Sequence, residues 1–113
     1  MPGHFELFID IGGQYRFRLR AANGEIILAS EDYYRNRGNA EKGIRSVRDN
    51  APLDERYERK TTSDGKHMFN LKAANHEVIG TSEAYETRAA RDGGIESVKT
   101  NAPSATIEDK TQG

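Results

Sequence analysis

The sequence predicts an α+β domain in which two tandem repeats, each strand–strand–strand–helix–strand, form a single, mostly antiparallel sheet. Two helices are expected on one face of this sheet, with the C-terminal strands exchanged between repeats. The first observation behind this prediction is that residues 17–27 recur, with few changes, as residues 69–79. The second is that apolar and polar residues alternate within each copy, as in a strand with one buried face. The third is a helical apolar stripe after each copy.

The first two strands are expected to form a hairpin. Four apolar residues alternate with polar neighbours along the first strand: Phe5, Leu7, Ile9 and Ile11. Gly12-Gly13-Gln14 is expected to form a three-residue loop, which places Ile9 beside Phe17 and Leu7 beside Leu19. This register keeps the charged alternates out of the core, whereas a slip of one residue would turn Glu6 inward.

A second hairpin is expected at Asn23-Gly24, because these residue types suit the two positive φ angles of a type I′ turn. A two-residue loop pairs Ala21 with Ile26 and Leu19 with Leu28 on the inner face. In the second copy His76 takes the place of Gly24, which makes that turn less regular.

A helix is expected to begin near Asn39, a plausible N-cap, and to end at Asn50-Ala51-Pro52, because proline cannot continue a helix. Its inner face carries Ala40, Ile44, Val47 and Ala51. Gly43 lies inside this helix, where glycine costs about 1 kcal/mol against alanine. We expect the helix to approach the sheet closely there and at the corresponding Gly94.

The whole chain, residues 1–113, is expected to be one domain, with repeat one over about 4–56 and repeat two over about 57–113. Tyr85 corresponds to Tyr33, and a one-residue deletion is expected after Tyr85. Residues 106–111 resemble residues 56–61 at an offset of 50, so each helix is followed by a similar extended segment. Because the first repeat otherwise lacks a closing strand, we expect this tail to cross over and pair with it.

Composition excludes several functional classes. The chain has 17 Lys+Arg against 18 Asp+Glu, a net charge of −1, so no global field attracts nucleic acid or anionic lipid. It has no Cys, which excludes disulfides and thiolate chemistry and fits a reducing compartment. No apolar stretch approaches the roughly 18 residues that span a bilayer. We therefore expect a cytoplasmic protein without membrane contact.

The repeated motifs resemble one known family. Each copy reads Phe-x-Leu-(Arg/Lys)-Ala-Ala-Asn, then Ser-Glu, then Gly-Ile-x-Ser-Val-x-x-Asn-Ala-Pro, and this pattern is similar to the YegP-like family of small bacterial proteins. The resemblance covers about residues 4–111 and implies tandem strand-rich repeats with exchanged C-terminal strands. It implies no activity, partner or site. Because single-repeat relatives would build the same sheet as dimers, the tandem chain favours a monomer. Arg59 departs from the pattern, since it replaces the core-facing Leu7.

Catalytic chemistry is not indicated. His4, His67 and His76 are too scattered to suggest a metal site by spacing. The paired glycines lack the context of a phosphate loop, and the serines lack that of a nucleophile elbow. We expect no enzyme activity, no catalytic residues, no cofactor and no metal.

One surface is a candidate for ligand binding. Four basic residues are expected on the outer sheet face, as a candidate contact for an anion or a nucleic acid: Arg16, Arg18, Arg20 and Lys72. With Phe8 on that face, and Tyr15 and Tyr34 near it, it could bind single-stranded RNA or DNA. The favoured alternative is a solvated face with Arg16 paired to Glu31. The preferred class is a non-catalytic binding or protein-interaction module, with a protein partner added at a strand edge.

Overall fold

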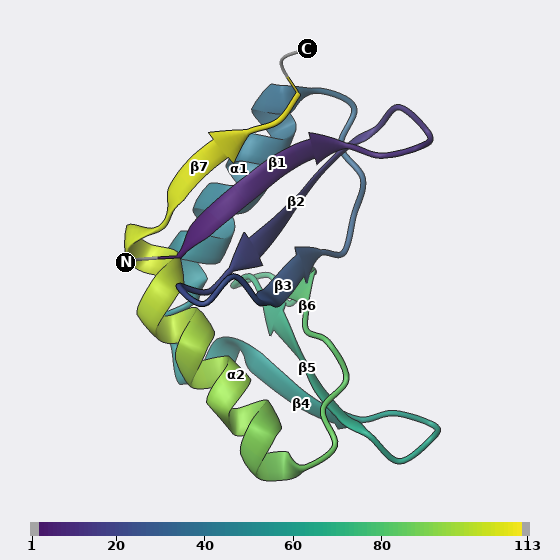
Figure 1. Cartoon of the computed structure of the whole chain (residues 1–113), viewed down its shortest axis with the longest axis vertical. Helices are drawn as coiled ribbons and strands as arrows, with labels where there is room; N and C mark the ends of the chain where they lie inside the picture. Colours follow the sequence, from purple (N-terminus) through teal and green to yellow (C-terminus); the bar gives the residue numbers. More distant parts are fainter. Residues whose placement is uncertain (1–2, 112–113) are drawn as a thin grey trace.

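The computed structural model describes residues 3–111 and contains one seven-stranded sheet with two α-helices. The strands are β1 (His4–Ile9), β2 (Tyr15–Arg20), β3 (Ile26–Ser30), β4 (Tyr57–Thr61), β5 (His67–Lys72), β6 (Val78–Thr81) and β7 (Thr106–Asp109). The helices are α1 (Arg37–Asn50) and α2 (Arg88–Asn101), and short 3₁₀ turns η1 (Asp54–Arg56) and η2 (Ala102–Ser104) follow them. The strand order is β4-β5-β6-β3-β2-β1-β7 (Figure 1). The α+β prediction is confirmed.

The two repeats join edge to edge and exchange their last strand. The halves meet where β3 and β6 pair antiparallel. β7 leaves the second repeat and pairs with β1, the only parallel pair among the described strands (Figure 1). The predicted tail strand is therefore confirmed, and it lies against the first repeat as expected.

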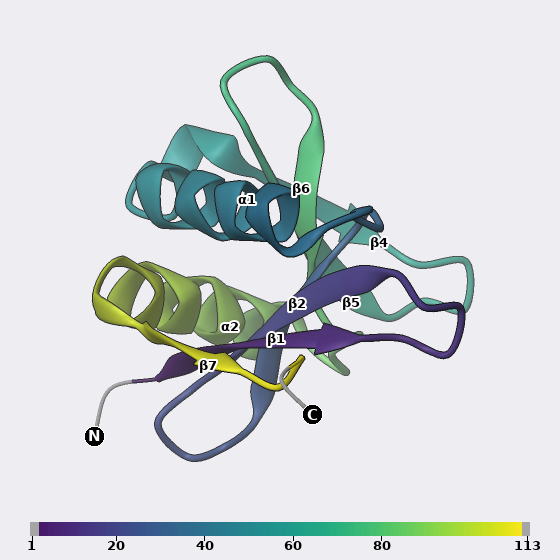
Figure 2. The ribbon, with the colours of Figure 1, turned by 90° about the horizontal axis from the view of Figure 1, so that it is seen from above.

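A single core lies between the sheet and the helices. Both helices lie on the same side of the sheet (Figure 2), and α1 contacts strands of both repeats. Eight apolar residues at corresponding positions of the two repeats are all at most 1% exposed and belong to one cluster: Phe17, Leu19, Ile44, Val47, Phe69, Leu71, Ile95 and Val98. Each repeat thus contributes half of a shared core.

Four hairpin loops have one common design, which differs from the predicted type I′ turn. In each, three residues connect a backbone pair such as Ala21 and Glu25, and the third of them has a positive φ. That residue is Gly13, Gly24, Gly65 or His76. Asn23 does not adopt a positive φ, so the Ala21–Ile26 pair is wrong: Ala21 faces Glu25, and a bulge follows Leu19. The Leu19–Leu28 pair is confirmed.

The predicted β1–β2 register is wrong by two residues. The loop is three residues long, as expected, but starts one residue earlier, because Gly13 and not Gln14 is its last member. Leu7 therefore faces Phe17, and Ile9 faces Tyr15. A shift of two preserves the faces of the strand, so the sequence pattern could not detect it. The strand ends at Ile9, and Ile11 is fully exposed in the loop.

The helix start is also corrected. Asn36, not Asn39, is the N-cap of α1, and its side chain accepts a hydrogen bond from the Asn39 backbone N–H at 2.8 Å. The close approach of the helix to the sheet at Gly43 is confirmed, because a Cβ there would lie 2.9 Å from the Phe17 ring of β2 and 2.6 Å from the Tyr34 hydroxyl. Gly94 has the same relation to Tyr85. Tyr85 therefore corresponds to Tyr34, and the one-residue deletion precedes it.

Candidate functional site

The three arginines of β2 lie on the outer face of the sheet, as predicted, but their guanidinium groups are engaged. Arg18 Nε lies 2.6 Å from Glu6 Oε1, and Arg20 Nε lies 2.8 Å from the same oxygen. Arg20 also donates to the carbonyl of Gly24, and Arg16 donates to the carbonyl of Ser30. The proposed Arg16–Glu31 pair is not formed: Glu31 accepts from Thr81 instead.

The aromatic side chains near this row are engaged as well. Arg18 stacks on Phe8 at 4.4 Å, and Arg16 lies 5.3 Å from the ring of Tyr33. Tyr34 does not reach this face, because it packs on the core side, stacked on Phe17. Tyr33, which is 61% exposed, lies near the arginines instead, where Tyr34 was expected. Each of these two rings thus has an arginine over it, and a base that stacked on the same face would have to displace that arginine.

Lys72 lies apart from the arginines, in the second repeat. Its Nζ is 3.1 Å from Glu58 Oε2, and Asn70 donates to the other oxygen of the same carboxylate. Glu58 corresponds to Glu6, so each repeat carries one glutamate between two donors of its second strand. The predicted four-residue row is therefore divided: Arg18 and Arg20 pair with Glu6, Lys72 pairs with Glu58, and Arg16 is held by the Ser30 carbonyl.

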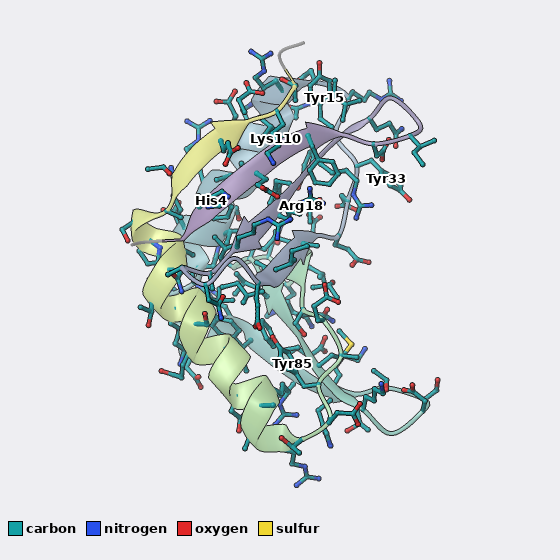
Figure 3. All side chains as sticks on the ribbon, in the orientation of Figure 1. His4, Tyr15, Arg18, Tyr33, Tyr85 and Lys110 are labelled. Atoms are coloured by element: carbon teal, nitrogen blue, oxygen red, sulfur yellow. The ribbon has the colours of Figure 1, made fainter. Side chains whose placement is uncertain are left out.

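Glu6 is the most unusual residue of the outer face. Its side chain is only 4% exposed, and Arg18, Arg20 and Lys110 converge on it. Burial alone would raise the pKa of Glu6, but the hydrogen bonds from these three cations outweigh it and hold the pKa far below its usual value of 4.5. Lys110 follows β7, so residues from the two ends of the chain close this cluster (Figure 3).

The Glu6 cluster also contains the one group of metal-ligating side chains found among residues 3–111. His4, Glu6 and Glu108 bring ligand atoms within 4.8 Å of one another. Three cationic side chains already contact the Glu6 carboxylate, so a divalent ion would have to displace them. These residues therefore do not form a convincing metal site. Sequence spacing could not show the group, because β7 brings Glu108 to His4.

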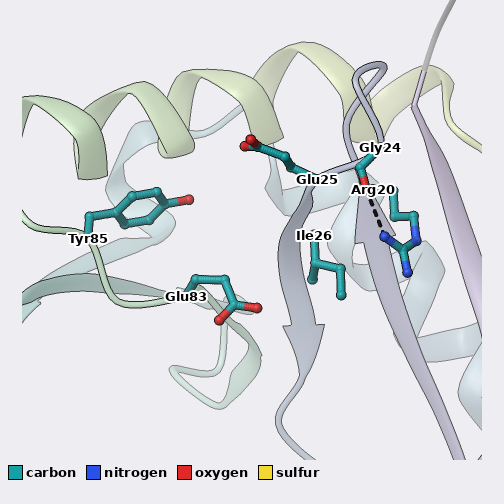
Figure 4. Close-up of a pocket in the computed structure, with 6 residues that line it drawn as sticks. All are labelled: Arg20, Gly24, Glu25, Ile26, Glu83 and Tyr85. Atoms are coloured by element: carbon teal, nitrogen blue, oxygen red, sulfur yellow. Dashed lines mark hydrogen bonds between the residues drawn. The ribbon is translucent and has the colours of Figure 1, made fainter.

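A cleft of about 360 Å³ lies where the two repeats meet (Figure 4). Its lining residues are Arg20, Gly24, Glu25, Ile26, Glu83 and Tyr85. Glu25 and Glu83 form no ion pair with any described residue, whereas Arg20 is already held by Glu6 and Gly24. Burial raises the pKa of the Tyr85 hydroxyl, and the nearby Glu83 and Glu25 carboxylates raise it further. The cleft is thus lined by two carboxylates and one arginine.

The outer edges of the corresponding strands β1 and β4 are the remaining candidate binding surfaces. β1 carries β7 on its outer side, held by the Glu6 cluster and by Arg48, which donates to the Ala105 carbonyl at 2.5 Å. β4 corresponds to β1 in the second repeat, yet it pairs only with β5 among the described strands. Its outer edge is therefore free to accept hydrogen bonds from another strand.

A cluster around Asp54 stands at the start of this free edge. Asp54 Oδ1 lies 2.8 Å from Lys99 Nζ and 3.0 Å from Arg59. Both cations lower the pKa of Asp54 through these hydrogen bonds, with Lys99 contributing most. Lys99 corresponds to Arg48, so the Asp54 carboxylate occupies the place that the Ala105 carbonyl has in the first repeat.

The comparisons with known proteins agree with this architecture. The family described as "Domain of unknown function (DUF1508)" matches twice, at residues 10–58 and 62–109. The chain belongs to this family. The UPF0339 protein YegP of Escherichia coli K12 is 55% identical over 111 residues, covering 98% of this chain and 100% of the relative. A UPF0339 protein of Acinetobacter baylyi is 53% identical over 98% of this chain and 99% of its own.

Two solution NMR structures are also similar. The yegP protein from Escherichia coli, described as of unknown function, has a TM-score of 0.92 at 53% identity, covering 100% of this chain and 97% of its own. The UPF0339 protein SO3888 from Shewanella oneidensis has a TM-score of 0.90 at 46% identity, covering 98% and 93%. The family is thus of unknown function, and the predicted resemblance and repeats are confirmed. Within residues 3–111, no helix has the length and apolar character needed to cross a membrane.

Proposed function

We propose that this protein is a non-catalytic interaction module that accepts an extended segment of a partner protein at the outer edge of β4. The observation that carries the proposal is the contrast between corresponding edges: β7 covers the edge of β1, and the edge of β4 has no strand on it within the described residues. Strand addition satisfies the free backbone groups of an edge and is a common mode of peptide recognition. The cytoplasm is the proposed location, in keeping with the cysteine-free sequence.

Position-specific cross-linking tests this proposal. A photo-reactive residue placed at Lys60, which is exposed on β4, should capture a partner protein from a cytosolic extract. The matched control carries the same residue at Lys42, which is exposed on α1. Capture at Lys60 alone, unchanged by nuclease, supports a protein partner at the edge. Equal capture at both positions, or none at Lys60, would reject the proposal.

Nucleic-acid binding through Arg16, Arg18, Arg20 and Lys72 is the alternative proposal. The ion pairs of Arg18 and Arg20 with Glu6 weigh against it, because a phosphate would have to displace a buried carboxylate. We expect negligible binding of single-stranded RNA or DNA at physiological salt. Sub-micromolar binding that falls steeply with salt, and is lost when the three arginines are changed to Ser, would favour the alternative.

A further inference from the structure

We propose that the segment bound at β4 runs parallel to it and carries an acidic residue followed directly by a lysine or arginine. This inference rests on the proposed function and adds the direction and chemistry of the partner. It uses the chain's own β7 as the template, because β7 occupies on β1 the position that is open on β4.

The template has two side-chain anchors on opposite faces of the sheet. β7 runs parallel to β1, with Asp109 beside Leu7, and the Lys110 N–H donates to the Leu7 carbonyl at 2.8 Å. On the helix side, Asp109 lies 3.2 Å from Arg37 Nε, at the start of α1. On the outer side, Lys110 Nζ lies 3.0 Å from Glu6. Adjacent residues of a strand point to opposite faces, so an acid–base pair in that order suits both anchors.

Both anchor positions keep their charge in the second repeat. Arg88 begins α2, as Arg37 begins α1, and it is exposed. Glu58 replaces Glu6 and, with a side chain 38% exposed, it can be reached by an incoming cation. A segment with an acid opposite Arg88 and a base opposite Glu58 would therefore repeat the contacts of Asp109 and Lys110. The reverse order would place like charges together on both faces.

The Asp54 cluster makes this docking conditional. In the first repeat Arg48 holds the carbonyl that precedes the strand, whereas the corresponding Lys99 is held by Asp54. A parallel partner must displace Asp54 to gain the same contact. Replacing Asp54 with Ala should therefore strengthen binding, since the Lys99 ammonium then keeps only its pair with Glu96 and has a donor available for the partner backbone.

Two peptides of identical composition test the inference on the full chain. The first copies residues 104–111, Ser-Ala-Thr-Ile-Glu-Asp-Lys-Thr, and the second exchanges the order of Asp and Lys. Titration of the isotope-labelled protein, followed by backbone NMR, should show shifts in β4 with the first peptide. Two exposed ion pairs, and the repulsion that replaces them, together correspond to about tenfold in affinity. Glu58→Lys combined with Arg88→Glu should reverse the preference.

A nitroxide on the peptide N-terminus reports direction. Broadening near Tyr57 indicates a parallel segment, and broadening near Thr61 an antiparallel one. Equal binding of both peptides at β4, or broadening near Thr61, would overturn the inference and leave the interaction module standing. Absence of β4 shifts together with absence of capture at Lys60 would reject both. Shifts confined to β1 and β7 would show exchange with the chain's own tail and would also overturn the inference.

Discussion

The two repeats carry the same glutamate at the same place in the sheet, yet only one is buried. The Glu6 side chain is 4% exposed and the Glu58 side chain 38%. The difference comes from β7, because Lys110 and Glu108 cover the first cluster and none of the strands within residues 3–111 covers the second. A strand that exists once in a twofold repeat thus makes the halves unequal in electrostatics as well as in pairing.

The two repeats also differ at the position of β1 and β4 whose side chain points toward the helices. Leu7 is buried beside β7, whereas the corresponding Arg59 is exposed and paired with Asp54 at 3.0 Å. A charged residue on the inner side of an edge strand hinders uncontrolled pairing between sheets. The open edge is therefore protected against aggregation while its outer side stays available, which fits selective pairing with one kind of partner.

Of the changes that test the difference between the two repeats, removal of β7 should have the largest effect on stability. Truncation after Pro103 would expose the β1 edge, uncover Glu6 and make the two halves alike. We expect the melting temperature to fall by about 10 °C or more, since each kcal/mol shifts it by roughly 4 °C in a domain of this size. Self-association should rise, because the short, solvent-exposed edge strand β7 is replaced at this edge by β1, which is longer and carries buried apolar residues.

Circular dichroism and light scattering would measure both effects of this truncation. The control ends after Thr111 and keeps β7 complete. A chain truncated after Pro103 that melts like this control and stays at its size would contradict the role assigned to β7.

The core should respond equally in both halves, in contrast to the edges. Leu19 and Leu71 are both fully buried in the shared cluster, so replacement of either by Ala should cost about 2–5 kcal/mol. Urea unfolding would measure the two values. A large cost in one repeat and little in the other would show that the repeats have separate cores.

The sequence could predict those features that depend on periodicity and repetition. The core of Leu19 and Leu71, and the tail strand, follow from the alternation and the repeated segments. It could not predict the β1–β2 register, because a shift of two residues leaves the same faces buried. Nor could it predict the burial of Glu6, which depends on Lys110, more than a hundred positions away. Alternation placed Glu6 on the outer face, and only the topology covers it.

The two glutamates should differ in their dependence on pH. Because the pKa of Glu6 is lowered on folding, its stabilisation is present above about pH 4.5 and is lost as the pH falls toward the folded-state pKa. Glu6→Gln should cost about 1–3 kcal/mol at pH 7 and progressively less in acid. Glu58→Gln should have a smaller effect, because solvent screens the exposed pair. Urea unfolding from pH 7 to pH 2.5 would test this, and equal profiles for the two variants would contradict the account of Glu6.

The smallest expected effect concerns the two turns that join the second and third strands of each repeat. Gly24 and His76 occupy the same loop position with φ of 87° and 72°, a region that costs a side-chain-bearing residue roughly 1–2 kcal/mol. His76→Gly removes this strain but adds backbone freedom to the unfolded chain, so we expect a net stabilisation of about 0.5–1 kcal/mol. Gly24→His is the reciprocal variant and should destabilise by a similar amount, because a Cβ at Gly24 meets nothing within 4 Å and the backbone strain outweighs the reduced freedom of the unfolded chain. Chemical denaturation resolves such differences. Destabilisation by His76→Gly would show that the imidazole makes a contact worth more than the strain it imposes.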